Sequence, residues 1–115
     1  MCCKRGRILL VERERSSWKL PGGTRRRNES PADAARRELS EETALDGYEL
    51  VYLFQFGGLN KRHHVFFTVL PDDARAEPSN EILRCRWFRP RKVATLISTV
   101  PTREIVNLLF GDGRT

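Results

Sequence analysis

The sequence predicts one α/β domain in which a mixed β-sheet lies between helices. Short segments rich in β-branched and aromatic residues recur along the chain, as they do in strands. Segments of helix-forming residues interleave with them, and such interleaved elements usually pack as helices against a sheet. The chain has 115 residues, which is enough for one domain with its own core but not for two.

The first half of the chain is expected to hold two strands and a tight turn. The apolar run from Arg7 to Glu12 fits a buried strand, and the polar residues 12–17 fit a loop. Residues 18–20 alternate in polarity and lead into a turn at Pro21-Gly22-Gly23, because paired glycines let the backbone bend sharply.

A helix is expected from Pro31 to about Thr43. Its interior contains no glycine or proline and consists mostly of good helix formers. Pro31 suits the first turn, since proline has a helical φ and needs no hydrogen-bond acceptor for an N–H there. Ser30, with Asp33 three residues later, fits a capping box at the start of this helix.

The second half is expected to hold three strands, a long loop and two helices. Residues 48–56 and 63–70 fit strands joined by a turn at 57–62, and the polar segment 71–80 is the longest loop. Residues 82–88 fit another strand, 93–98 a short helix, and 102–110 a helix that stops at Gly111. The strand at 48–56 should place four apolar side chains on one face: Leu50, Tyr52, Phe54 and Phe56.

Composition narrows the class of protein. No run of about 18 apolar residues exists, so no membrane span is expected, and Met1 to Arg7 is too short to begin a signal peptide. The three cysteines lack the spacing of metal ligands, which favours a reduced, cytoplasmic protein. The net charge of +6 fits either an anionic partner or a general bias toward arginine.

Three glutamates on the first expected helix suggest a metal site. Glu38, Glu41 and Glu42 fall at i, i+3 and i+4 and therefore share one helix face. Crowded carboxylates repel one another unless cations lie among them, and Mg²⁺ prefers oxygen ligands. The alternative is an ordinary solvated face on which the glutamates pair with Arg36 or Arg37.

The spacing of residues 23–45 resembles the Nudix box, the signature of a hydrolase family that cuts nucleoside diphosphates linked to another group. Gly23 is followed by Glu29, then by Arg37-Glu38-Leu39, Glu41-Glu42 and Ala44-Leu45. The resemblance covers 23 residues at fixed spacing, and one fixed position departs from it. It implies a single Nudix domain over residues 1–115, with a Nudix-type α/β/α sandwich and a mixed β-sheet.

The resemblance also implies a mechanism, in which a metal-bound water attacks a phosphorus of a diphosphate linkage with Mg²⁺ or Mn²⁺ as cofactor. In the family the box glutamates bind the metal, the first glycine contributes its carbonyl, and one acid serves as general base. Here Glu42 is the best candidate for a direct ligand, and Glu38 is either a ligand or the base. By this resemblance the catalytic residues are Arg37, Glu38, Glu41 and Glu42, the metal ligands include Gly23, and Glu29 supports Arg37.

Many family members use a further acid from a late loop. Glu81, six residues before Trp87, fits this position, with Glu77 as its rival and an ion pair near Arg84 as the alternative.

The departure from the box is Ala44, where the family has glycine. Either Ala44 keeps the left-handed geometry at a cost of about 1–2 kcal/mol, or the helix continues to Gly47.

Substrate recognition is less specified than catalysis. Nucleoside triphosphates are the default substrate of a MutT-like hydrolase, and the basic loops also allow a diphosphoinositol polyphosphate or a triphosphorylated RNA 5′ end. Arg25 and its arginine neighbours could contact phosphates, although a solvated loop is an equal alternative. The other candidates for substrate binding are Phe54 and Phe56, which could instead belong to the core, and His63.

Two further hypotheses belong to other classes. A catalytically weak Nudix-fold module could bind a nucleotide and regulate a partner without turnover. A basic RNA-binding domain rests on charge alone and would bind without Mg²⁺.

Family members usually have a full strand before the one matching Arg7–Val11, whereas only Met1 to Lys4 precede it here, so stability or a homodimer could depend on how the sheet is completed.

Overall fold

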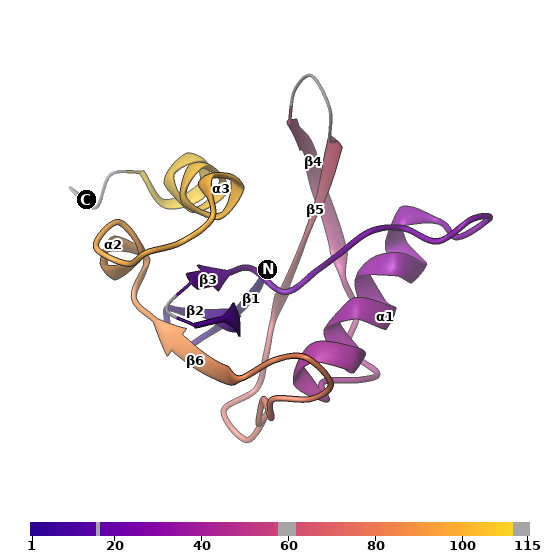
Figure 1. The fold of residues 1–115 in the computed structure, drawn as a ribbon, viewed down its shortest axis with the longest axis horizontal. Coiled ribbons are helices and arrows are strands. Elements are labelled where there is room, and N and C mark those ends of the chain that lie inside the picture. Colours follow the sequence, from indigo (N-terminus) through magenta and orange to yellow (C-terminus); the bar gives the residue numbers. More distant parts are fainter. Residues whose placement is uncertain (16, 58–61, 112–115) are drawn as a thin grey trace.

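The computed structural model describes residues 1–15, 17–57 and 62–111. Over these residues the chain forms a six-stranded sheet with helices on both sides, which confirms the α/β class expected from the sequence (Figure 1). The elements follow one another as β1 (Cys2–Lys4), β2 (Arg7–Glu14), β3 (Ser17–Lys19), α1 (Pro31–Thr43), β4 (Val51–Gly57), β5 (Arg62–Val69), β6 (Arg84–Phe88), α2 (Pro90–Val93) and α3 (Val100–Phe110).

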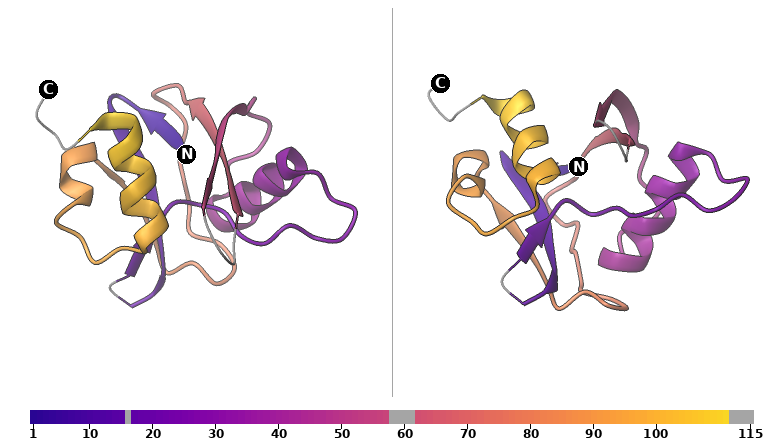
Figure 2. Two further views of the ribbon diagram at one scale, coloured as in Figure 1. Left: turned by 90° about the horizontal axis from the view of Figure 1, so that it is seen from above. Right: turned by 45° about the horizontal axis from the view of Figure 1, so that its top comes forward.

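The sheet is mixed, as predicted. Its strand order is β3-β2-β1-β5-β4, and β6 pairs with β2. The pairing of β1 with β5 is parallel, whereas the other strand pairs are antiparallel. Helix α1 lies on one side of the sheet and α2 and α3 on the other, so the layers form the α/β/α sandwich expected of the Nudix fold (Figures 1 and 2).

Strand β2 supplies the centre of both cores. Its residues Ile8 to Val11 are completely buried, in agreement with the apolar run in the sequence. Successive side chains of a strand point to opposite faces. Leu9 accordingly packs in the cluster that contains Leu39 of α1, whereas Ile8 and Leu10 pack in the cluster that contains residues of α2 and α3.

The short first strand lies inside the sheet. Although β1 has only three residues, it pairs with β2 on one side and with β5 on the other. The amino group of Met1 donates a hydrogen bond of 2.6 Å to the carbonyl of Phe66, which extends the same pairing. A few residues therefore complete the junction between the two halves of the sheet.

Helix α1 has the predicted bounds and the predicted N-terminal cap. The hydroxyl of Ser30 accepts a hydrogen bond of 3.1 Å from the backbone N–H of Asp33. At the other end Ala44 adopts a left-handed conformation, with φ 60° and ψ 12°. Of the two alternatives, the helix thus stops at the box position and does not continue to Gly47.

Strand β4 corrects one expectation. Its register against β5 shifts between Tyr52 and Phe54, because Leu53 is an extra residue in the ladder. Tyr52 pairs with Phe66, whereas Phe54 pairs with Val65, so these two aromatic side chains lie on opposite faces. The prediction that Leu50, Tyr52, Phe54 and Phe56 share one face is therefore wrong.

Several boundaries also differ from expectation. Strand β2 continues to Glu14, because its last residues pair with β3. The strand expected from residue 48 begins at Val51, and the strand expected from residue 82 begins at Arg84. The short helix expected at 93–98 lies instead at Pro90–Val93, since a proline in the first turn favours helix initiation. Most of the turn expected at 57–62 falls outside the described residues.

Candidate functional site

The Gly22–Gly23 turn lies directly against two glutamates of α1. The backbone N–H of Gly22 donates a hydrogen bond of 2.7 Å to Oε1 of Glu42. At Gly23 a β-carbon would lie 2.7 Å from Cδ of Glu38, so only glycine leaves room for this carboxyl group. The turn and the helix therefore position each other.

Lys19 holds the turn from the other side. Its ammonium group donates a hydrogen bond of 2.7 Å to the carbonyl of Gly22 and lies 3.4 Å from Oε2 of Glu42. In addition, the backbone N–H of Leu20 donates to Oγ1 of Thr102 at 3.0 Å, which ties the turn to α3. Lys19 could not be recognised from the sequence, because a single lysine before a turn carries no spacing signal.

Arg37 organises the other carboxylates of the site. Its guanidinium donates to both carboxylate oxygens of Glu29, at 2.8 and 2.9 Å. It also donates to Glu38 at 2.6 Å and to Glu41 at 3.3 Å, and to the carbonyl of Thr24 at 3.0 Å. A planar guanidinium can make such a fork of bonds, whereas a lysine cannot. The expected pairing of Arg37 with Glu29 is present.

These contacts shift the pKa of Glu29. The hydrogen bonds from Arg37, followed by the one from the backbone N–H of Arg26, lower the pKa of Glu29 to about 2. The same ion pairs raise the pKa of Arg37 above its already high value. Both groups therefore stay charged throughout the neutral range, and their side chains are only 16% and 15% exposed. Arg37 and Glu29 form a permanent support for the site.

Glu42 is the most buried of the three box glutamates. Its side chain is 9% exposed, and burial raises its pKa, while the nearby Lys19 opposes this shift. Glu42 also acts on Cys85, whose thiol pKa rises to about 11 through burial and the neighbouring carboxylate. Cys85 is accordingly a thiol and a poor nucleophile at neutral pH.

Glu41 lies at the rim of the site. Its side chain is 40% exposed and is 3.4 Å from a guanidinium nitrogen of Arg26. The side-chain amide of Asn80 donates a hydrogen bond of 2.7 Å to the carbonyl of Glu41, which joins the long loop to the end of α1. Asn80, like Lys19, could not be recognised from the sequence, since a lone asparagine in a polar loop is not distinctive.

The donor set fits a hard divalent cation in its chemistry. The side chains of Glu38, Glu41 and Glu42 and the carbonyl of Gly23 offer oxygen ligands, which Mg²⁺ and Mn²⁺ accept. Each of the three carboxylates pairs with a lysine or an arginine, so these cations already offset the negative charge of the carboxylates. Across the described residues, no three acidic, histidine or cysteine side chains are arranged as a ready metal cage.

The late-loop acids lie at the end of α1, but neither joins the box carboxylates. Glu81 forms an ion pair with Arg13 of β2, and its side chain is 72% exposed. Glu77 is exposed, and its backbone N–H bonds to the carbonyl of Thr43 at 2.8 Å. The expected alternative partner, Arg84, instead binds the buried carboxylate of Glu12 through two hydrogen bonds of 2.9 and 2.7 Å.

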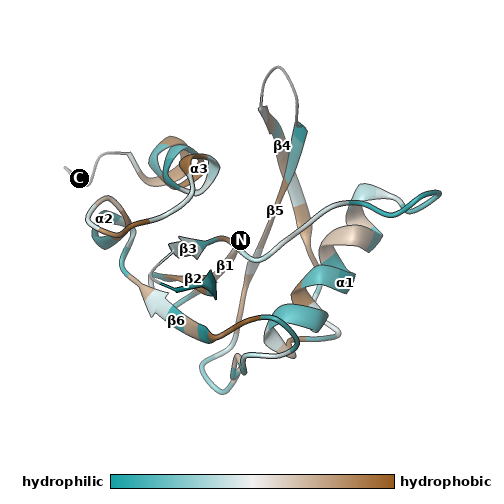
Figure 3. Cartoon of the chain, in the orientation of Figure 1, coloured by the Kyte–Doolittle hydropathy of each residue, from teal (hydrophilic) through white to brown (hydrophobic). Residues whose placement is uncertain are grey.

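The candidate substrate residues occupy two separate places. Arg25 is exposed in the loop before α1, whose tip is hydrophilic (Figure 3). Phe56 and His63 are opposite each other on β4 and β5, with ring centroids 6.4 Å apart, and Phe54 shares their face of the hairpin. All three side chains of this hairpin group are half-buried, so part of each surface is available for contact.

Comparisons with known proteins agree with the fold. The family model for the NUDIX domain matches residues 1–109. The Mycobacterium tuberculosis protein named "Putative 8-oxo-dGTP diphosphatase 3" is 32% identical over 95 residues, which span 76% of this chain and 44% of that protein. The chain thus spans less than half the length of this curated relative.

Two further similarities cover more of both molecules. A MutT-like protein of Streptomyces ambofaciens is 27% identical over 113 residues, which span 94% of this chain and 71% of the relative. The structure of the E. coli dihydroneopterin triphosphate pyrophosphohydrolase superposes with a TM-score of 0.75 at 18% identity, over 94% of this chain and 90% of that one. The match over 109 residues, together with the box geometry, establishes that this chain belongs to the Nudix family.

Proposed function

We propose that this protein is a metal-dependent, MutT-like hydrolase that cleaves a diphosphate linkage in a nucleoside triphosphate, a nucleoside diphosphate or a related nucleotide derivative. The observation that carries this proposal is the contact of Glu38 and Glu42 with the Gly22–Gly23 turn. A site freed from catalysis would have no need to keep buried carboxylates against a glycine turn, because burying charge is costly.

Glu38, Glu41, Glu42 and the carbonyl of Gly23 would hold Mg²⁺ or Mn²⁺. When bound, such an ion lowers the pKa of a coordinated water and offsets charge on the phosphoryl oxygens. Arg37 keeps Glu38 and Glu41 oriented through its ion pairs, while Glu29 fixes Arg37. Glu38 is the candidate base if Glu42 serves as a ligand, and Glu81 would have to leave Arg13 to contribute.

The substrate is proposed from the residues around this site. A nucleobase could stack on Phe54 or Phe56, and His63 or Arg25 could contact phosphates. Nucleoside triphosphates are therefore the first substrates to test, and the name of the Mycobacterium relative adds 8-oxo-dGTP to them. A triphosphorylated RNA 5′ end is a further candidate, because the basic loops suit a highly charged substrate.

Two properties of the whole protein are also proposed. We expect a cytoplasmic location, which is supported by the three free cysteines. No described helix is both long and apolar enough to cross a membrane. A homodimer is supported by the exposed apolar residues Val51, Tyr52 and Leu53 along β4, and light scattering at several concentrations would test it.

A single substitution tests the catalytic assignment. Glu42→Gln preserves side-chain size and removes one metal-binding carboxylate, so metal-dependent hydrolysis should fall at least about 100-fold. Glu104→Gln is the matched control, because this exposed glutamate lies on α3, outside the box. Turnover that is equal in the two variants would exclude the assignment. Tight nucleotide binding without turnover by the unmodified protein would favour the regulatory module instead.

A further inference from the structure

A basic groove lies where the turn after β1, the end of β6 and α2 meet. Two adjoining cavities, of about 460 and 840 Å³, share the lining residues Arg7, Trp87, Arg89 and Arg91. Their lining residues come from the turn after β1, the end of β6, α2 and Phe110 of α3, and in the ribbon views α2 and α1 lie at opposite ends of the fold (Figures 1 and 2). We call this region the basic groove after its six cationic residues, Lys4, Arg5, Arg7, Arg89, Arg91 and Lys92.

The charge of this groove exceeds what the general composition provides. Lysine and arginine make up 21 of the 115 residues of the chain, but they form half of the residues that line the two cavities. Among the residues that the structure describes, no acidic side chain lines either cavity. A bias toward arginine spread over the surface does not explain this local concentration.

Most of these cations have no acidic partner. Arg5 pairs with Asp72 at 2.7 Å, but both side chains are more than half exposed, so the pair is weak. Within the part of the chain that the structure describes, no ion pair involves Arg7, Arg89, Arg91 or Lys92. Uncompensated like charges in one concavity repel one another, and a ligand with several negative charges would relieve that repulsion.

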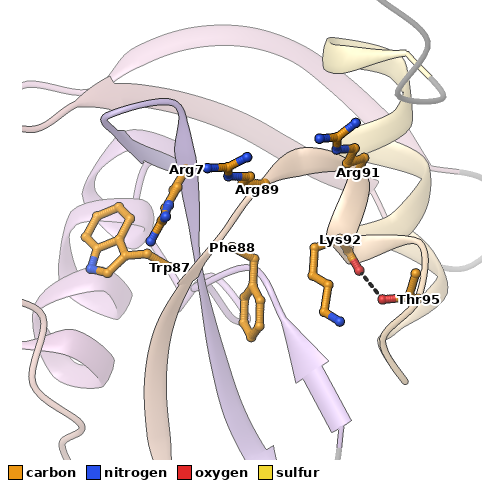
Figure 4. Close-up of a pocket in the computed structure, with 7 residues that line it drawn as sticks. All are labelled: Arg7, Trp87, Phe88, Arg89, Arg91, Lys92 and Thr95. Carbon is orange, nitrogen blue, oxygen red and sulfur yellow. Dashed lines mark hydrogen bonds between the residues drawn. The ribbon is translucent and has the colours of Figure 1, made fainter.

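The groove also offers aromatic surface. Trp87 and Phe88 lie among the arginines, with Phe88 between Trp87 and Lys92 (Figure 4). The ammonium of Lys4 lies 4.7 Å from the centre of the Trp87 ring, which fixes a cation beside this aromatic surface. Cations together with aromatic carbon, in cavities of this size, suit a ligand that has both phosphates and flat bases.

We propose that the basic groove binds single-stranded nucleic acid, through its phosphates and at a site separate from the glutamates of α1. Arginine guanidinium groups bind phosphate oxygens through paired hydrogen bonds. A single strand can follow a concave groove and turn a base toward the half-buried ring of Trp87, which lines both cavities, whereas the bases of a duplex are enclosed. This binding needs no divalent metal and no diphosphate linkage, so it stands independently of the proposed hydrolysis.

Fluorescence anisotropy tests the proposal with a labelled, mixed-sequence single strand of about 12 nucleotides, within the site sizes known for such grooves. The strand has a 5′-hydroxyl and the buffer contains EDTA, so the box glutamates have neither a substrate nor a metal. The groove variant is Arg89→Gln with Arg91→Gln. The control is Arg75→Gln with Arg103→Gln, which removes the same charge from exposed positions outside the groove.

The wild-type protein should bind the strand with an affinity that falls as salt rises. The groove variant should bind at least about tenfold more weakly, and its salt dependence should be shallower by about 1.4, as expected for two lost phosphate contacts. The control should stay within about twofold of the wild type. Thermal unfolding of both variants should match the wild type, because all four arginines are exposed.

Three results would overturn the proposal. Equal loss of affinity in the groove variant and in the control would show that only net charge matters. Unchanged binding by the groove variant would place the strand elsewhere. Displacement of the strand by inorganic tripolyphosphate at the same total phosphate concentration would identify the ligand as a small polyphosphate. Hydrolysis of nucleotides with Mg²⁺, measured on the same proteins, reports separately on the box glutamates.

Discussion

The carboxyl group of Glu38 packs against the α-carbon of Gly23, where a β-carbon would lie 2.7 Å from both Cδ and Oε2. Real β-carbons do not approach other atoms this closely, so any side chain at residue 23 must move the carboxylate. Arg37 holds the same carboxylate at 2.6 Å from the other side. The turn and the arginine together leave Glu38 one narrow position.

Gly23→Ala should therefore impair hydrolysis more than stability. The added methyl group would push Glu38 away from its place, and a displacement of about 1 Å in a catalytic group can cost about 100-fold in rate. Gly47→Ala is a useful control, because Gly47 has a φ of 80° and should lose stability, while it lies outside the site. Comparing kcat and the free energy of unfolding separates the two effects. Equal kcat values for the two variants would contradict this interpretation.

The low pKa of Glu29 predicts how stability depends on pH. Its pKa is about 2 in the folded protein and 4.5 ordinarily, so the ion pair with Arg37 contributes fully above about pH 5. That contribution should disappear as the pH falls from about 4.5 toward 2, because Glu29 becomes protonated. Urea unfolding of the wild type and of Glu29→Gln should thus show a difference that is constant near neutrality and shrinks in acid.

Glu49→Gln serves as the reference for this pH series, since Glu49 is exposed. It removes one carboxylate of the same type from a position outside the ion pair of Glu29 with Arg37, so the two variants are compared at each pH. A difference between the wild type and Glu29→Gln that is independent of pH would show that the ion pair with Arg37 does not contribute to stability.

Lys19 compensates the charge of Glu42 when no metal is present. Lys19→Met should destabilise the metal-free protein by about 1–3 kcal/mol, because it leaves a buried carboxylate without its cation. In this variant Mg²⁺ no longer competes with the ammonium of Lys19 for Glu42. Mg²⁺ should therefore stabilise the variant more than the wild type, since a ligand that binds only the folded state raises stability in step with its affinity. Thermal unfolding with and without Mg²⁺ measures both effects, with exposed Lys92→Met as the control. A Mg²⁺ effect no larger than in the wild type would exclude this role.

Ala44 offers a test of the departure from the box. Its left-handed conformation costs a non-glycine residue about 1 kcal/mol, so Ala44→Gly should raise the free energy of unfolding by roughly that amount. Ala35→Gly, in the interior of the same helix, should lower it by about 1 kcal/mol. Chemical denaturation of both variants measures whether each substitution raises or lowers the free energy of unfolding. A loss of stability in Ala44→Gly would mean that the helix end is not strained.

The sequence predicted helix α1 more accurately than it predicted the sheet. Helix α1 could be placed at both ends, because Ser30, Pro31 and the box spacing are local signals. The glutamates that share its face follow from helix geometry alone. In contrast, the bulge at Leu53 arises from pairing with β5, and no local pattern of apolar residues reveals a register shift between distant strands.

The contacts of Lys19 and Asn80 were not predicted for the same reason, because they join residues that are distant in the sequence. Lys19 acts on the site through an ion pair with Glu42, and Asn80 through a hydrogen bond to the carbonyl of Glu41. Neither residue type is distinctive at its position. The pairing of Glu81 with Arg13 likewise depends on how the long loop folds back onto β2, which a spacing rule based on Trp87 does not include.

The most direct test of the proposed hydrolase is the release of phosphate and pyrophosphate from a panel of nucleoside triphosphates, 8-oxo-dGTP, sugar nucleotides and dinucleotides. Each reaction should be run with Mg²⁺, with Mn²⁺ and with EDTA, using the wild type and Glu42→Gln. The proposal predicts release from at least one substrate class that requires the metal and is lost in Glu42→Gln. Release that persists in EDTA or in Glu42→Gln, or no release from any substrate, would contradict it.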